Sequence, residues 1–187
     1  GGLEEAIRQI ALATNKFHKV ENKIFALSEV PKPSKIFSDE GEVIRSKSWI
    51  APRNCDIGLW ESLKNFKKLN DWADIVHYHF PWPFADLLHL ISKKDKPSIM
   101  TYHSDVVGKG LAGTIYNPLK NIMLRDMKKI IATSPNYISS SSTLSAYSND
   151  RKLSVIPLGI SEESLKKHLA EAEKINIEDT FGVKQNN

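Results

Sequence analysis

The 187-residue sequence has little of what several protein classes require. Cys55 is its single cysteine, which excludes an internal disulfide framework and a cysteine metal site and favours a reducing compartment. No apolar run reaches the roughly 18 residues that a membrane-spanning helix needs. Gly1 to Glu5 carry neither the basic nor the apolar region of a signal peptide. We therefore expect a cytoplasmic protein.

Neither sign of charge dominates, because 26 basic residues face 22 acidic ones and leave a net charge of +4. Nucleic-acid binders usually concentrate positive charge on one stripe, so we expect no nucleic-acid partner. Seven basic residues lie in or just after two predicted helices: Lys64, Lys67, Lys68, Lys120, Arg125, Lys128 and Lys129. They form either solvated helix faces or a patch for peripheral contact with the anionic inner face of the cell membrane.

Strand and helix signals alternate along the chain, which predicts an α/β fold with a Rossmann-like parallel sheet flanked by helices. Short apolar runs predict strands at residues 24–27, 75–80, 98–102, 130–133 and 153–158, and residues 43–49 form a weaker, edge-like candidate. Apolar spacings of three and four predict helices over residues 3–17, 59–66 and 85–91; a fourth contains Ile122 and a fifth begins at Ser134. Residues 31–38 carry two prolines and cannot be helical throughout, and residues 106–113 are a glycine-rich loop.

The ends of the chain predict its domain organisation. Gly1 and Gly2 stand directly before a helix, whereas a doubly wound fold begins with a central strand. We expect residues 1–160 to form one Rossmann-like domain, truncated at its start. Residues 161–187 are charged and amphipathic, and we expect them to lead to an absent C-terminal domain.

The opening glycines are the first candidate site. Glycines at a strand-to-helix turn let backbone N–H groups approach a phosphate, although Gly1 and Gly2 also suit a plain tight turn. The Gly-x-Gly-x-x-Gly pattern is not satisfied here, which disfavours nicotinamide binding. We expect no cofactor.

Residues 74–83 hold the second candidate. Strand periodicity places His77 and His79 on one face, where two imidazoles either bind a metal or pack as hydrogen-bonded histidines. The chain is too short for the barrel of the metal enzymes with such pairs, so we expect no metal site. Pro81 and Pro83 end the strand and leave Trp82 as either a core residue or a platform for a sugar ring.

The most specific motif is Thr101 to Asp105, at the carboxyl end of a predicted strand. It delivers His103, Ser104 and Asp105 just before the glycine-rich loop that carries Lys109. Histidine titrates near neutrality and can exchange hydrogen bonds with a hydroxyl that undergoes transfer. Near-neighbours on one strand end rarely form a hydrolase triad, and the sequence has no Gly-x-Ser-x-Gly elbow.

Five segments in order resemble the family 4 glycosyltransferases: the Gly-Gly-Leu-Glu start, residues 74–83, residues 101–105, residues 132–137 and residues 155–160. The resemblance covers essentially the whole chain and is nearest to bacterial mannosyltransferases of surface-polysaccharide assembly. It implies a retaining enzyme of the GT-B type, built from two Rossmann-like domains, of which this chain is the N-terminal, acceptor-binding one.

The resemblance also implies roles for particular residues. His103 would face the transferred sugar as the catalytic residue, and Gly1 and Gly2 would lie near the donor diphosphate. The acceptor side would be lined by His79, Trp82, Ser104, Asp105 and Lys109. Ser134 and Asn136 would lie at the mouth of the cleft.

The implied substrates are a nucleotide-sugar, GDP-mannose in the first place, and a glycan or lipid-linked acceptor. The family's C-terminal domain supplies the basic residues that bind the diphosphate and a Glu-x7-Glu motif for the donor, so we expect no transfer by this chain alone.

Two other functions are open at this point. A Rossmann-like module could bind a nucleotide or a partner protein without chemistry. A metal-dependent hydrolase could be built on His77, His79 and His103.

Overall fold

A computed structural model describes residues 2–51, 55–92, 96–106, 111–159, 162 and 165–166, and the side chains of residues 111–115 are outside the description. The chain divides into two compact units, Gly1–Pro157 and Leu158–Asn187. All the strands that the structure describes belong to the first unit. The domain boundary expected after residue 160 stays a prediction.

The first sheet contains β1 (Lys23–Ser28), β2 (Lys35–Ser38) and β3 (Gly41–Lys47) in the order β1-β3-β2. β3 runs parallel to β1 and antiparallel to β2. The edge-like prediction for residues 43–49 is therefore wrong, because β3 is the central strand. The true edge is β2, whose four residues are all exposed and which lies in the segment predicted only to be non-helical.

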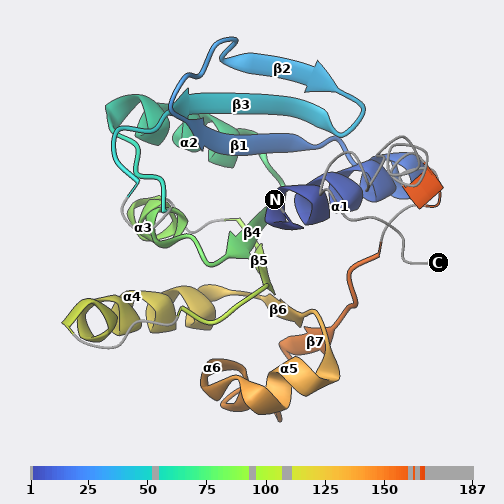
Figure 1. The fold of residues 1–187 in the computed structure, drawn as a ribbon, viewed down its shortest axis with the longest axis vertical. Helices are drawn as coiled ribbons and strands as arrows, with labels where there is room; N and C mark the ends of the chain where they lie inside the picture. The colour runs from blue at the N-terminus through green and yellow to red at the C-terminus, as the bar shows by residue number, and fades with distance from the viewer. Residues whose placement is uncertain are drawn as a thin grey trace, which may run out of the picture. The chain divides into compact units, whose positions relative to one another are not determined.

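The second sheet is parallel, as predicted, and carries the candidate site. Its strands β4 (Val76–Phe80), β5 (Ser98–Tyr102), β6 (Lys129–Ala132) and β7 (Leu153–Val155) lie side by side in chain order (Figure 1). The register pairs His79 with Thr101 and Phe80 with Tyr102. Parallel strands end at one edge, so the residues that follow β4 and β5 come together there.

The expected single sheet is replaced by two, since β1 and β4 pair with different strands. Aromatic side chains join them instead of backbone hydrogen bonds. Phe25 of β1 contacts Phe66 edge-on at a centroid distance of 5.8 Å and stacks on Trp82 at 6.1 Å. Phe66 also lies 6.5 Å from Tyr78 of β4. One hydrophobic core therefore serves both sheets.

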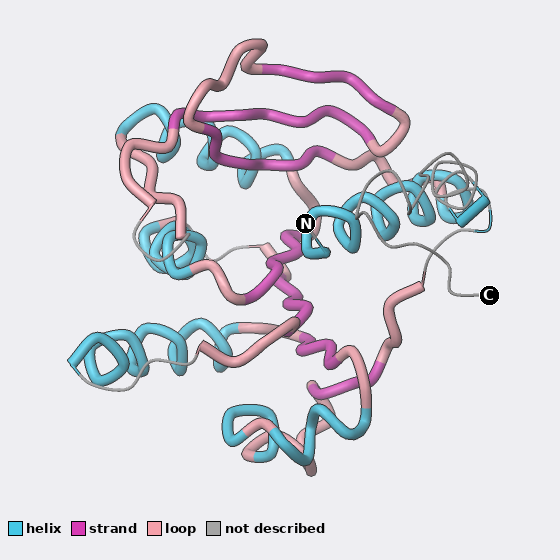
Figure 2. The backbone as a smooth tube through the Cα atoms, viewed as in Figure 1, coloured by secondary structure: helices cyan, strands magenta, loops and turns pink. Residues whose placement is uncertain are grey.

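Six helices are described: α1 (Gly2–His18), α2 (Trp60–Trp72), α3 (Pro83–Ile91), α4 (Leu111–Asp126), α5 (Pro135–Ser140) and α6 (Ser142–Ser145) (Figure 2). α4 begins inside the predicted loop at residues 106–113. α5 begins where predicted, with Pro135 in its first turn and the Ser134 hydroxyl accepting a hydrogen bond from the Tyr137 backbone N–H. Of these helices, α3, α4 and the α5–α6 pair connect successive strands of the parallel sheet.

The two faces of the β4–β7 sheet differ in chemistry because side chains alternate along each strand. Tyr78, Phe80, Met100 and Tyr102 lie on one face and belong to the buried core, together with residues of α3 and α4. His77, His79 and Thr101 occupy the alternate positions and lie on the other face. A one-residue shift of register would exchange the two sets, so the core specifies where the histidines lie.

The predicted basic groups do not form one patch. Lys64, Lys67 and Lys68 are exposed on α2, where Lys67 pairs with Asp71 at 2.5 Å. Lys120 is half-buried and donates a hydrogen bond to Thr143 at 3.0 Å, so its charge serves the packing of α4. None of the described helices combines the length and the apolar character needed to cross a membrane.

Candidate functional site

Three histidines of two neighbouring strands lie next to one another, and we call this row of rings the histidine stack. The His77 and His79 rings of β4 are 4.4 Å apart between centroids and 29° from parallel. His103, the first residue after β5, places its ring 5.3 Å from that of His79 at 21°. The His103 backbone N–H donates to the Phe80 carbonyl at 3.0 Å, which extends the β4–β5 ladder by one residue and fixes where the third ring lies.

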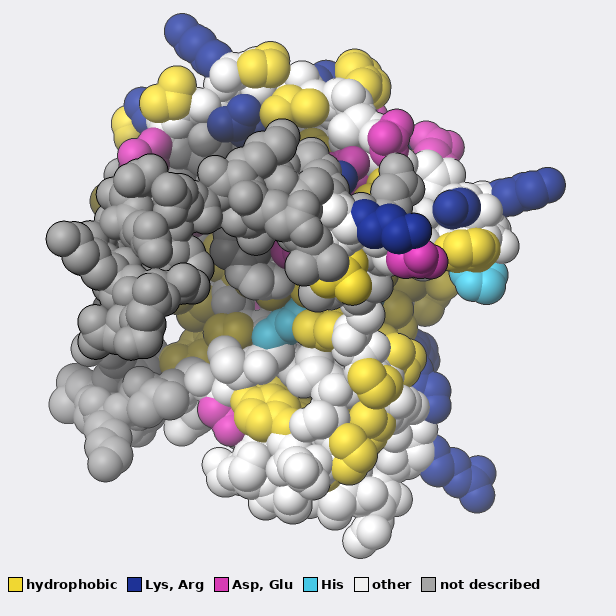
Figure 3. Space-filling view, turned by 45° about the vertical axis from the view of Figure 1, so that its right-hand side comes forward, with side chains coloured by type: hydrophobic (Ala, Val, Ile, Leu, Met, Phe, Trp, Pro, Cys, Tyr) yellow, Lys and Arg dark blue, Asp and Glu magenta, His cyan; other side chains and the backbone are white. Residues whose placement is uncertain are grey.

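Hydrogen bonds tie this stack together at both ends. His79 Nδ1 lies 3.0 Å from His103 Nε2, and His77 Nε2 lies 2.8 Å from the Thr101 hydroxyl. Of the three rings, that of His103 has the most access to solvent. Figure 3 shows a histidine side chain in the hollowed middle of one face of the molecule, with hydrophobic side chains beside it.

Burial keeps the stack uncharged near neutral pH. Desolvation lowers the pKa of His77 to about 4, with a smaller contribution from repulsion by His103. Desolvation also lowers the pKa of His79 strongly and that of His103 less. Neutral imidazoles hold one N–H and one lone pair each, so the three rings can exchange directional hydrogen bonds without mutual repulsion.

Asp105 is held by one residue of its own motif and by one that lies far from it in the sequence. Its Oδ1 accepts hydrogen bonds from the Tyr102 hydroxyl at 2.8 Å and from the Ser141 hydroxyl at 2.9 Å. Tyr102 and Ser141 are buried, and burial raises the pKa of the Tyr102 hydroxyl, so it remains a donor. The Asp105 carboxylate therefore anchors the segment after β5 to the α5–α6 connection.

Trp82 lies in the packing between the two sheets. Its indole N–H donates to the Asp56 carbonyl at 2.9 Å, and its ring stacks on Phe25 at 24° and lies 6.0 Å from Phe84. Trp82 is partly buried and packs against the core, and the acceptor contact that the resemblance implies for it stays a prediction.

The other predicted site residues are placed as follows. Ser104 is exposed beside His103, and Asn136 is exposed on α5. Ser134 caps α5. Gly2 opens α1 with open space around its Cα. Gly1 and Lys109 lie outside the described residues, so the predictions for a diphosphate at Gly1 and for an acceptor contact at Lys109 stay predictions.

Thr101, Tyr102 and Ser141 were not assigned as site residues from the sequence. Thr101 and Tyr102 belong to the motif already singled out, and strand alternation alone puts them on opposite faces. Ser141 lies in a run of four serines and carries no local signal of its own. Its partner is 36 residues away, a distance that periodicity cannot bridge.

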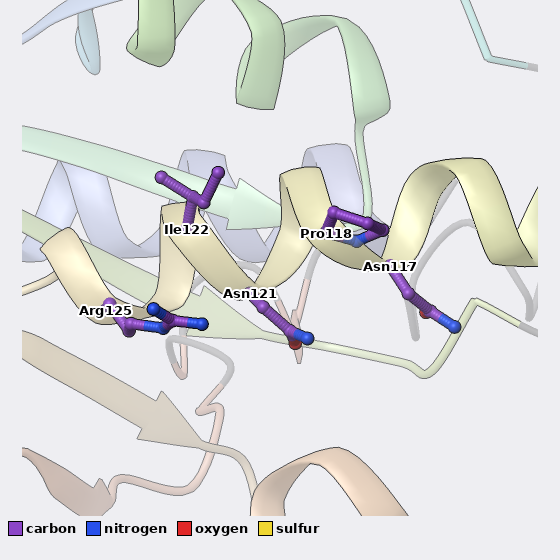
Figure 4. Close-up of a pocket in the computed structure, with 5 residues that line it drawn as sticks. All are labelled: Asn117, Pro118, Asn121, Ile122 and Arg125. Carbon is purple, nitrogen blue, oxygen red and sulfur yellow. The ribbon is translucent and has the colours of Figure 1, made fainter.

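Two surface depressions among the described residues lie away from the three histidines. One of about 600 Å³ is lined by a single stretch of α4: Asn117, Pro118, Asn121, Ile122 and Arg125 (Figure 4). Another of about 440 Å³ lies between the end of α1 and the β2–β3 turn. Neither includes a predicted site residue or a histidine, so chemistry rather than concavity identifies the strand-end cluster as the site. Among the described residues, no group of three metal-ligating side chains is arranged to hold a metal ion.

Comparison with known proteins defines the class. The family model for Glycosyltransferase Family 4 matches residues 1–164, and the chain belongs to this family. The chain is similar to O-antigen chain mannosyltransferase C of Escherichia coli, with 33% identity over 89% of this chain and 44% of that protein. It is also similar to D-rhamnosyltransferase WbpZ of Pseudomonas aeruginosa, with 34% identity over 89% of this chain and 43% of that protein. The chain thus spans less than half the length of these curated relatives.

A solved structure supports the fold. A sucrose-phosphate synthase chain from Thermosynechococcus elongatus matches with a TM-score of 0.50 and 18% identity, over 91% of this chain and 92% of that one. At this identity the likeness concerns the fold alone, and it agrees with the α/β architecture expected from the sequence.

Proposed function

We propose that this chain is the acceptor-binding part of a retaining glycosyltransferase that acts in surface-polysaccharide synthesis. The transferred sugar would be mannose, the donor GDP-mannose and the acceptor a glycan or a lipid-linked glycan. Family membership supports sugar transfer, and the two relatives are named for mannose and rhamnose transfer. The proposal includes a cytoplasmic enzyme in peripheral contact with the membrane and a donor-binding domain beyond this chain.

One observation carries the proposal: His103 stands at the carboxyl end of a central parallel strand, with one ring nitrogen bonded to His79. In open parallel sheets this edge is where ligands bind. No hydrogen bond to the other ring nitrogen, Nδ1, occurs among the described residues, so that atom is available to a sugar hydroxyl. A neutral imidazole can donate or accept such a bond during transfer.

The test is His103→Ala in the full-length enzyme, assayed with GDP-mannose and a lipid-linked acceptor. We expect kcat to fall by roughly 100-fold or more, the range for loss of a group that hydrogen-bonds the reacting centre, while calorimetric binding of the donor persists. His18→Ala, at the exposed end of α1, is the matched control and should leave turnover unchanged. Normal turnover in His103→Ala would contradict the catalytic assignment.

The same experiment separates transfer from binding without chemistry. A full-length protein that binds nucleotide-sugar but shows no turnover with any glycan acceptor would favour the binding module. A hydrolase built on the histidine stack would instead contain stoichiometric metal after purification and lose activity with a chelator.

The proposal also predicts that the 187-residue chain alone transfers no sugar. Stabilisation of the leaving diphosphate is commonly the largest catalytic contribution, and in this family the second domain supplies it. Robust turnover by the isolated chain would contradict the assignment of this chain to the acceptor side.

A further inference from the structure

The position of His79 does not suit direct contact with a sugar. Its ring lies between those of His77 and His103, with centroids at 4.4 Å and 5.3 Å. His77 therefore covers one face of the imidazole, and His103 occupies its Nδ1 edge. The Nδ1 atom lies 3.0 Å from His103 Nε2, so this nitrogen of His79 is already hydrogen-bonded.

We propose that His79 is a positioning residue, which holds His103 in one tautomer and one ring orientation through the Nδ1–Nε2 hydrogen bond. This rests on the proposed function, in which His103 faces the transferred sugar, and it replaces the acceptor contact predicted for His79.

The hydrogen bond couples the tautomers of the two rings. A hydrogen bond between two imidazole nitrogens needs one N–H and one lone pair, so the two rings share one proton along the Nδ1–Nε2 line. Whichever ring donates, His103 Nδ1 is then specified as either a donor or an acceptor. A free imidazole would exchange both forms and rotate about its side-chain bonds, and a defined hydrogen bond to the sugar would be populated only part of the time.

The rest of the stack holds His79 itself in place. His77 covers one face of the His79 ring and is fixed by the hydrogen bond between its Nε2 and the buried Thr101 hydroxyl at 2.8 Å. The backbone of His103 is fixed by its bond to the Phe80 carbonyl. Both partners of the Nδ1–Nε2 bond are thus attached to paired strands, which is the rigidity that orientation of a reacting group requires.

The experiment is a double-mutant cycle in the full-length enzyme, with His79→Phe, His103→Ala and the double variant. Phenylalanine keeps a ring in the stack but cannot hydrogen-bond. We expect His79→Phe to lower kcat by roughly 3- to 100-fold with little change in KM for the acceptor, in line with coupling between contacting residues. In the His103→Ala background the same change should have no further effect.

His79→Asn is the conservative variant. Its amide can place a hydrogen-bonding atom near the position of Nδ1, so we expect recovery of most of the turnover that His79→Phe loses. If His79→Phe raises the acceptor KM equally with and without His103, His79 contacts the acceptor directly and the proposal is overturned.

Nitrogen NMR of histidine-labelled enzyme supplies a readout that does not depend on turnover. We expect a single His103 tautomer in the wild type and in His79→Asn, and mixed tautomers in His79→Phe, with His18→Phe as the unaffected control. Mixed tautomers in the wild type would overturn the positioning role, even if His79→Phe failed to fold. Unchanged turnover in His103→Ala would instead remove the proposed function and leave the tautomer result standing.

Discussion

Histidines lie on both sides of the β4–β7 sheet, and the comparison separates a site from a structural network. On one side, His103 lies at the strand end, and within the described part of the chain only its Nε2 has a hydrogen-bond partner. On the other, His89 of α3 is 4% exposed, and its Nδ1 and Nε2 lie 3.1 Å from the Tyr78 hydroxyl and 3.3 Å from Asp126 Oδ2. The first arrangement leaves a nitrogen for a ligand, whereas the second uses both nitrogens to join β4, α3 and α4.

Two aspartates, Asp86 and Asp105, differ in how deeply they are buried. Asp86 of α3 is 2% exposed and accepts a hydrogen bond from the Tyr116 hydroxyl. Desolvation raises its pKa to about 6, against the lowering effects of Tyr116 and Lys120. Asp105 lies at the edge of the sheet beside His103 and binds two hydroxyl groups. Asp86 is thus enclosed by the fold, whereas Asp105 is half-buried and its carboxylate holds the segment after β5 at the sheet edge.

The largest expected difference in stability is between the alanine variants of His89 and His103. His89→Ala should lower the free energy of unfolding by about 2 to 4 kcal/mol, because it removes the hydrogen bonds to the buried Tyr78 hydroxyl and to Asp126 and opens a cavity. His103→Ala should cost less than about 1 kcal/mol, since its ring is only half-buried. Urea denaturation of the full-length enzyme measures both. The comparison fails if His103→Ala is the more destabilising, or if His89→Ala lowers kcat of the folded enzyme.

The pH dependence of stability should have opposite signs on the two sides. The folded pKa of His77, about 4, lies below its ordinary 6.5, so the unfolded chain binds the proton first as pH falls. Its contribution is complete above pH 6.5 and is lost towards pH 4, by at most about 3 kcal/mol. The folded pKa of Asp86, about 6, lies above its ordinary 3.8, so its contribution is complete below pH 3.8 and is lost as pH rises to about 6.

Asp86→Asn tests these opposing signs, because the amide oxygen can still accept from Tyr116 but cannot titrate. Between pH 4 and 6 we expect the variant to lose stability on acidification more steeply than the wild type, with the histidine contribution now unopposed. Denaturation curves at several pH values provide the measurement. Parallel stability profiles for the two proteins would show that Asp86 does not titrate as described.

Removal of one hydroxyl group from each face of the β4–β7 sheet should lower the free energy of unfolding by a smaller amount. Tyr78→Phe removes the hydroxyl that lies next to His89 Nδ1, and Thr101→Val removes the hydroxyl that lies next to His77 Nε2. Each should cost about 1 to 2 kcal/mol, the usual effect of losing a hydrogen bond at a buried site. Only Thr101→Val should alter the histidine NMR signals of the strand-end stack. A matching perturbation by Tyr78→Phe would mean that the two networks are coupled through the sheet.

The smallest expected effect concerns Ser134, predicted from sequence to lie at the cleft mouth. Ser134→Ala removes the cap of α5 and should cost about 1 kcal/mol. Ser139→Ala, an exposed serine on the same helix, is the control and should change stability by only a few tenths of a kcal/mol. Thermal denaturation can resolve the pair, and equal stabilities would show that the cap contributes nothing.

Much of the fold could be predicted because it depends on local pattern. The strand at residues 98–102 was located to the residue, and the others within a few residues, since apolar runs bounded by breakers are a local property. β2 was missed because it is an exposed edge strand, whose residues carry no burial pattern. The central position of β3 was not predicted either, because strand order depends on which strands pair and not on any one segment.

The candidate site divides in the same way. By itself, the sequence determined that His77 and His79 share a face and that His103 stands at a strand end, because strand alternation is a property of neighbouring residues. Only the tertiary structure decided that His79 binds His103, that Asp105 is held by Ser141, and that Trp82 packs against Phe25. These contacts depend on register and on long-range packing, and both are settled when the strands and helices assemble around one core.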